Sequence, residues 1–149
     1  MKREINIKNQ CLLLVNYFIK INYGGSGATS VWKWDKEFVE KTGMENTFKK
    51  RQVLCIYSDL LEGIRHFKDE QLKDFLAFCQ ENNGEFSLGK GKDWRVINFF
   101  LKERIINSVY EFEVLTKLFN DYKEDSKMKS DKKKEIEFLL ENWTKDNKI

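Results

Sequence analysis

The chain contains no proline and a single histidine among its 149 residues. Because proline usually marks loops and strand edges, its absence favours short connections between helices. His66, beside Phe67, is this single histidine, and one histidine excludes histidine-rich metal sites. A serine–histidine or cysteine–histidine catalytic pair would have to use this one residue. We therefore expect a protein without enzymatic activity, metal or other cofactor.

Cysteine is also scarce, with three residues far apart in the sequence at Cys11, Cys55 and Cys79. Each stands in an apolar stretch, so we expect three reduced thiols in the core and no disulfide framework. Reduced cysteines are typical of a cytoplasmic protein.

Long hydrophobic runs are missing as well. The apolar run at residues 11–15 is too short to span a membrane, and Asn16 and Lys20 interrupt the apolar residues after it. No small-residue cleavage site comes after it, so we expect neither a signal peptide nor contact with a membrane.

Charge of neither sign dominates, because 27 basic and 24 acidic residues leave a net charge of +3. Charge nevertheless varies along the chain: residues 84–110 carry +2 and residues 68–83 carry −2. This balance permits a nucleic-acid partner without requiring one.

The spacing of apolar residues predicts an all-α protein, a single domain over residues 1–149 built as a bundle of five or six helices. The first run, residues 9–22, is so continuously apolar that its pattern fits either a helix or a buried strand, and its length favours a helix. Further helices are expected over 31–41, 45–66, 69–81 and 94–122, with a potential break at 107–108. A last helix carries Ile136 and Trp143.

Three connections separate these helices. The first is a glycine-rich connection at 24–30, after which Thr29 or Ser30 can cap a helix. The second is a flexible loop at 84–93, with a short hairpin or an extended loop near 85–93. The third is a charged linker at 123–134 before the C-terminal helix. Thr42 and Glu45 have the spacing of a capping box at the start of the helix expected over 45–66.

The glycine-rich stretch "GGSGATS" does not match a phosphate-binding loop. It has no lysine at the position where a P-loop lysine meets the phosphates, and its glycines lack the spacing of a dinucleotide-binding turn. A flexible connection leading into a helix is the favoured interpretation, and an unspecific anion contact at the helix start stays open. An enzyme that binds a nucleotide at this glycine loop is the alternative to a protein without enzymatic activity.

Two tryptophans, Trp32 and Trp34, flank Lys33 directly after the glycines. Residues two apart on a helix point in nearly opposite directions, so both cannot lie on one core face. One of them should be exposed, and exposed tryptophans are enriched in binding hot spots. The predicted partner-binding residues are Trp32, Lys33, Trp34, Gly24, Gly25 and Gly27, with peripheral packing as the alternative.

Residues 35–57, "DKEFVEKTGMENTFKKRQVLCIY", place two helices around Gly43 with a basic triplet at the start of the second. This segment loosely resembles a helix-turn-helix, although Val39 stands where a small residue is usual. The resemblance implies that Lys49, Lys50 and Arg51 would face DNA in the major groove. An ordinary helical hairpin with a solvated basic turn is the competing interpretation.

The stretch "GKGKDWR" at 89–95 combines cations with an aromatic residue. Lys90, Lys92 and Arg95 could follow a phosphate backbone while a base stacks on Trp94. Alternatively, Trp94 anchors the following helix in the core.

These observations favour a non-enzymatic helical binding protein that docks on a macromolecular partner, in the first place a protein. Small inhibitors, immunity factors and small subunits of larger assemblies are proteins of this kind. The alternative is a nucleic-acid-binding module that uses residues 35–57 and 89–95. The oligomeric state stays open.

Overall fold

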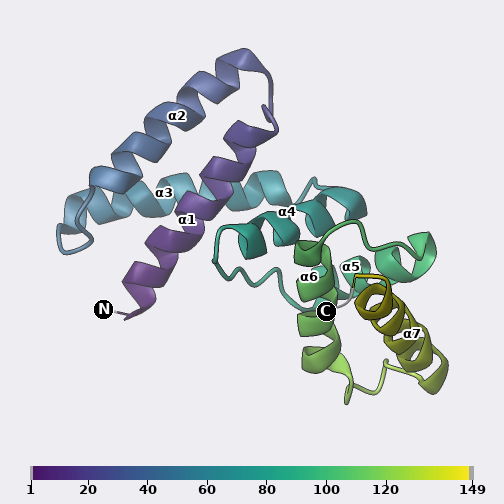
Figure 1. Ribbon diagram of the computed structural model, residues 1–149. Coiled ribbons are helices and arrows are strands. Elements are labelled where there is room, and N and C mark those ends of the chain that lie inside the picture. The colour runs from purple at the N-terminus through teal and green to yellow at the C-terminus, as the bar shows by residue number, and fades with distance from the viewer. Residues whose placement is uncertain (1, 148–149) are drawn as a thin grey trace. The chain divides into compact units, whose positions relative to one another are not determined.

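The computed structural model describes residues 2–147, with side chains from residue 7 onward. These residues form α-helices and no strand (Figure 1). The seven helices are α1 (Lys2–Lys20), α2 (Ser26–Lys41), α3 (Thr47–Ile64), α4 (Asp69–Glu81), α5 (Lys90–Glu103), α6 (Val109–Tyr122) and α7 (Ser130–Asn147). The all-α prediction is confirmed, whereas the expected number of five or six helices is too low.

The additional helix comes from the long element expected at 94–122, which is two helices. Arg104 ends α5 in the left-handed conformation, with φ of 57°, and its N–H donates to the Phe100 carbonyl at 2.7 Å. Ser108 then caps α6 by accepting a hydrogen bond from the Glu111 N–H at 3.1 Å. The potential break at 107–108 is thus present, within a connection at 104–108.

The helices gather into two compact units, residues 1–67 with α1 to α3 and residues 68–149 with α4 to α7. Each unit has buried apolar side chains of its own. The single domain expected over residues 1–149 stays a prediction.

In the first unit, α1 packs against both α2 and α3. Figure 1 shows α1 and α2 side by side and running in opposite directions. Burial on two faces explains why the first apolar run shows no clean period. The buried side chains of α1 are Cys11, Leu14, Val15, Tyr17 and Phe18. The helical alternative for residues 9–22 is therefore confirmed, with the helix beginning earlier than expected.

An aromatic cluster closes one end of this unit around Phe18. The Phe18 ring lies 4.6 Å from Tyr23, 5.4 Å from Trp32 and 5.6 Å from Phe67, measured between centroids. Gly63 of α3 makes room for it, because a Cβ at Gly63 would lie 2.9 Å from two atoms of the Phe18 ring.

The connections of the first unit are shorter than expected. Gly24 and Gly25 have φ of 80° and 90°, a conformation that favours glycine, and α2 begins directly after them at Ser26. The glycine-rich connection therefore ends at residue 25, and no side chain caps α2. The capping prediction for Thr29 or Ser30 is wrong: each hydroxyl donates to a carbonyl one turn back.

The start of α3 also differs from the prediction. Asn46 caps this helix by accepting a hydrogen bond from the Lys49 N–H at 3.0 Å. Thr42 instead ends α2, since its hydroxyl donates to the Phe38 carbonyl at 2.7 Å. The capping box expected from Thr42 and Glu45 is therefore wrong.

In the second unit, α4 packs on α5 and α6, and α7 packs on the same two helices. A buried ion pair joins α4 to α6: Lys73 Nζ lies 3.3 Å from Glu111 Oε1, with side chains 7% and 11% exposed. The ammonium group also lies 5.1 and 5.4 Å from the ring centroids of Phe99 and Phe100. Glu111 Oε1 further accepts a hydrogen bond from the Asn107 N–H at 3.1 Å. The cation is thus compensated by a carboxylate and two ring faces.

Two connections of this unit match the predictions in part. Residues 84–89 form an extended loop without a hairpin, held by Phe86 against Phe75 at 5.0 Å between centroids. The expected flexible loop at 84–93 is wrong in its second half, because α5 begins at Lys90. The charged linker is likewise shorter than 123–134, since α7 begins at Ser130.

Replacing Gly63 by alanine should lower the free energy of unfolding by about 1–2 kcal/mol, because the new methyl group overlaps the buried Phe18 ring. Gly27→Ala is the matched control: its Cβ meets no heavy atom within 4 Å, so the variant should gain up to about 1 kcal/mol from helix propensity. Urea unfolding measures both changes. Equal effects at the two glycines would show that the Phe18 contact is not tight.

Replacing Lys73 by methionine should lower the free energy of unfolding by about 3 kcal/mol, because it leaves the Glu111 carboxylate buried without its cation. Adding Glu111→Gln should recover part of this loss, since the amide oxygen still accepts from Asn107. Lys117→Met, which removes an exposed amino group 3.8 Å from Glu85, should change stability very little. Denaturant unfolding measures these changes. If the losses in unfolding free energy of the two single variants added up to that of the double variant, Lys73 and Glu111 would not be coupled.

Candidate interaction surface on α2 and α3

The two neighbouring tryptophans of α2 point in different directions. Trp32 packs on Phe18, and its indole Nε1 donates to the Tyr23 carbonyl at 3.1 Å. Trp34 is 63% exposed. The expectation that one tryptophan is exposed is confirmed, and the exposed one is Trp34.

Trp34 forms the wall of a surface groove together with Phe38, one turn further along α2. Their rings are nearly parallel, with 10° between the planes and 5.7 Å between centroids. The groove has a volume of about 290 Å³. It is lined by Trp34, Glu37, Phe38, Lys41, Thr42 and Lys49, and we call it the Trp34 groove. Val31, 55% exposed and one turn before Trp34, extends the apolar stripe along α2.

The polar rim of the Trp34 groove carries one cation in excess. Lys41 Nζ pairs with Glu37 Oε1 at 2.7 Å, and this hydrogen bond raises the pKa of Lys41 and lowers the pKa of Glu37. Lys49, in the first turn of α3, is exposed and makes no ion pair with any described residue. The groove thus combines an apolar wall, a neutralised ion pair and one available ammonium group.

The other predicted partner-binding residues lie elsewhere on α2. Lys33 is exposed beside Trp34 in the sequence but does not line the groove. Gly24 and Gly25 precede α2 and Gly27 stands in its first turn, so the glycines lie about two helical turns before Trp34. The structure therefore groups Trp34 with Lys49 from the other predicted site, and not with the glycines.

The basic triplet that resembles a helix-turn-helix does follow a short turn between two helices. Lys49 and Arg51 are exposed, and Lys50 is partly buried. However, α2 and α3 each pack mainly on α1 rather than on one another, whereas the two helices of a DNA-binding hairpin hold each other. Phe48, beside the triplet, is 71% exposed and adds apolar surface.

The second basic stretch begins a helix in the other unit. Lys90 pairs with Asp125 at 2.8 Å, and Arg95 pairs with Asp69 at 2.6 Å, while Lys92 is partly buried. Trp94 is 7% exposed. The alternative in which Trp94 anchors the helix in the core is confirmed.

Trp94 is covered by neighbours from α6 and α7. Its ring lies 5.6 Å from the Tyr122 ring, and Lys132 Nζ lies 5.3 Å from its centroid. Asp93 beside it accepts a hydrogen bond from the Tyr122 hydroxyl at 2.6 Å. Burial, then this bond to a carboxylate, raises the pKa of Tyr122. A base could not stack on this indole without displacing its neighbours.

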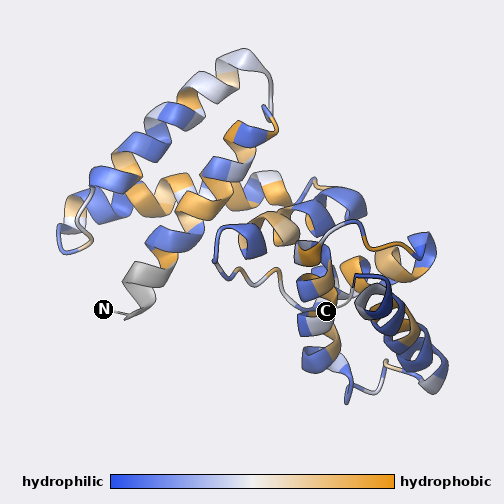
Figure 2. Cartoon of the chain, viewed as in Figure 1, coloured by the Kyte–Doolittle hydropathy of each residue, from blue (hydrophilic) through white to orange (hydrophobic). Residues whose placement is uncertain are grey.

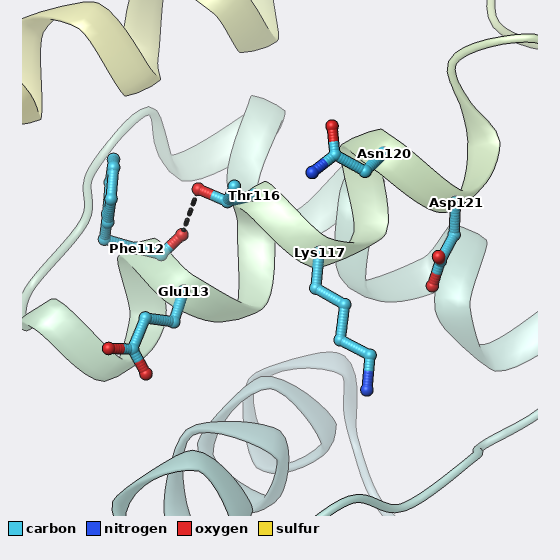
Figure 3. Close-up of a pocket in the computed structure, with 6 residues that line it drawn as sticks. All are labelled: Phe112, Glu113, Thr116, Lys117, Asn120 and Asp121. Atoms are coloured by element: carbon cyan, nitrogen blue, oxygen red, sulfur yellow. Dashed lines mark hydrogen bonds between the residues drawn. The ribbon is translucent and has the colours of Figure 1, made fainter.

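A second groove, which no sequence motif indicates, lies along α6 (Figure 3). It has a volume of about 400 Å³ and is lined by Phe112, Glu113, Thr116, Lys117, Asn120 and Asp121. Phe112 stacks on Trp143 of α7 at 6.1 Å between centroids. The Thr116 hydroxyl donates to the Phe112 carbonyl of its own helix at 2.8 Å, as Figure 3 shows. The charged residues that line this groove alternate in sign along α6, so they favour neither an anionic nor a cationic ligand.

The cysteines and the histidine do not form a reactive cluster. Burial raises the pKa of Cys11 and of Cys79 to about 12, which keeps both as unreactive thiols. Cys55 is exposed, so the prediction of three core thiols is wrong for this residue. His66 is exposed just after α3. Among residues 7–147, no group of three histidine, cysteine or acidic residues could hold a metal ion.

One acid in the first unit is buried. Asp35, on α2 beside Trp34, is 9% exposed and lies near Cys11 and Asp59. Burial, and then the Asp59 carboxylate, raises the pKa of Asp35. Both effects act in the same direction, because each disfavours the ionised carboxylate.

None of the described helices is long and apolar enough to cross a membrane. Comparison with models of protein families, with curated proteins and with solved structures found no match to this chain.

Replacing Asp35 by asparagine should stabilise the protein at neutral pH and have little effect in acid. Because the pKa of Asp35 is raised in the folded state, folding loses stability as the pH rises and this carboxyl ionises. Asparagine removes that penalty. Urea unfolding across this pH range measures the difference, with the exposed Asp146→Asn as control. A less stable Asp35→Asn variant at neutral pH would mean that the carboxylate is favourably compensated.

Proposed function

We propose that this chain is a non-enzymatic helical protein that binds a protein partner through the Trp34 groove. The observation that carries the proposal is the exposed Trp34 ring, 63% accessible and stacked on Phe38. Tryptophan is among the residues most enriched in binding hot spots, and such anchors are usually surrounded by a polar rim.

Burial of these rings would supply a useful part of a binding free energy. A large aromatic side chain buries roughly 150–250 Å² on complete desolvation. At about 25 cal/mol per Å², the two partly exposed rings would contribute several kcal/mol. Stacking restrains both side chains before a partner arrives, which lowers the entropy cost of binding.

The proposal includes the class of protein and its location. A small helical chain that presents one aromatic groove suits an inhibitor, an immunity factor or a small subunit, since these act by occupying a partner's surface. The three free cysteines support a reducing, cytoplasmic location.

Nucleic-acid binding is the second candidate, favoured by the exposed Lys49 and Arg51 at the start of α3. The ion pairs of Lys90 and Arg95 and the burial of Trp94 weaken it at the other basic stretch. A phosphate-binding surface would also show a steep loss of affinity with salt.

Peptides selected from a displayed random library on the full chain should bind through Trp34. Trp34→Ala should weaken them by about tenfold or more, because it removes the groove wall. Phe138→Ala is the matched control: this aromatic residue is 54% exposed and belongs to the other unit. Fluorescence anisotropy with labelled peptides measures both affinities.

Peptides that bind Trp34→Ala as tightly as the parent chain would refute this site. Failure to recover any binding peptide, together with salt-sensitive binding of single-stranded DNA, would support the second candidate instead.

A further inference from the structure

We infer that the Trp34 groove takes an acidic protein segment in which a large apolar side chain is flanked by carboxylates. This inference rests on the proposed function and names the chemistry of its partner. It follows from the size of the groove, from its apolar wall and from the charges around it.

The size of the groove limits what can fill it. Its volume of about 290 Å³ lies just below the range of typical ligand pockets, about 300–1,000 Å³. It is formed by side chains of one helix face and the first turn of the next, so it is open along one side. Such a groove suits one protruding side chain of a protein segment better than an enclosed small molecule.

The wall of the groove determines the anchor. The parallel rings of Trp34 and Phe38 offer an apolar face to the groove. A leucine, phenylalanine or tryptophan side chain would pack against this face and remove it from water.

The charges select the residues beside the anchor. Glu37 is the one acid among the six lining residues, and Lys41 neutralises it at 2.7 Å. Lys49 is left without an ion pair to a described residue, and so are Arg51, two positions after it in α3, and Lys33, beside Trp34 in α2. No acid in the first turn of α3 offsets Lys49. A carboxylate that follows the anchor would therefore find a cation within the groove.

The first unit as a whole also has a positive net charge. Residues 1–67 have eleven basic and seven acidic side chains, a net charge of +4, whereas residues 68–149 have sixteen basic and seventeen acidic side chains. The positive charge is thus concentrated in the unit that holds the groove, where it attracts an acidic partner from a distance.

An acidic protein segment fits these observations better than a nucleic acid. A phosphate backbone engages several cations side by side. Within the groove, Lys41 is already paired with Glu37, and Lys49 alone remains. One available cation next to an apolar wall matches one carboxylate next to an apolar anchor.

The test compares three labelled probes on the full chain by fluorescence anisotropy. The first is a short peptide with a central phenylalanine between glutamates, and the second has lysines in place of those glutamates. The third is a single-stranded oligothymidylate. We expect the acidic peptide to bind about tenfold more tightly than the basic one. Lys49→Glu should abolish this preference, while Lys102→Glu, at an exposed lysine in α5, should leave it unchanged.

The outcomes together distinguish failure of this inference from failure of the proposed function. Equal binding of the acidic and basic peptides, or a preference that survives Lys49→Glu, overturns the inference. Tighter binding of the oligothymidylate than of either peptide overturns it as well, in favour of a nucleic acid. If library peptides need Trp34 but carry no excess of acidic residues, the proposed function stands and the inference fails. If no probe and no library peptide depends on Trp34, both fail.

Discussion

The burial of α1 on two faces is the constraint on which the first unit depends. A helix in contact with neighbours on both sides needs apolar residues around most of its circumference. Leu14, Val15 and Phe18 meet that need, and α2 and α3 gather around them. Because α2 offers only one face to α1, its other face is left to solvent. The Trp34 groove lies on that outward face, so the position of the groove follows from the packing of α1.

The second unit depends on a different kind of contact. Its central helices α4 and α6 are joined by Lys73 and Glu111, whose charges are buried against two phenylalanine rings. A buried ion pair adds little stability compared with apolar packing. However, an arrangement that buries either charge without its partner is strongly destabilised, so the pair fixes the contact between α4 and α6. Both units bury apolar cores, and they differ in the contacts that fix which helices meet: aromatic contacts around Phe18 in the first unit, and a compensated charge in the second.

The sequence predicts the helices well where burial is one-sided. The helix predicted over 69–81 is present as α4, and Leu72, Phe75, Leu76 and Cys79, which have helical spacing, form its buried face. Prediction from the sequence fails where the burial of a residue depends on neighbours far away along the chain. Cys55 stands in an apolar stretch, yet it lies two residues from the buried Val53 and hence on the opposite side of α3. The burial of Lys73 could not be predicted, since its partner is 38 residues away and lysines are almost always solvated.

Part of the candidate site could be predicted from the sequence, and part could not. Helical geometry alone requires Trp32 and Trp34 to diverge, but the choice between them depends on which face of α2 meets Phe18. The contribution of Lys49 was not predictable, because it comes from the next helix and reaches the groove only through the turn at residues 42–46. Trp94 illustrates the converse case, in which Tyr122 and Lys132 from later helices cover a ring that its own sequence surroundings would leave exposed.

The composition of α7 has a consequence for how the second unit opens. This helix is largely hydrophilic, as its blue colour in Figure 2 shows, and its buried residues are Ile136 and Leu139 alone among those described. The free energy that holds a helix in place scales with the apolar surface it buries, so local unfolding begins where that surface is smallest. In the second unit that helix is α7. We therefore expect the amide protons of α7 to exchange with solvent before those of α4 to α6, and such an opening would uncover Phe112, which stacks on Trp143.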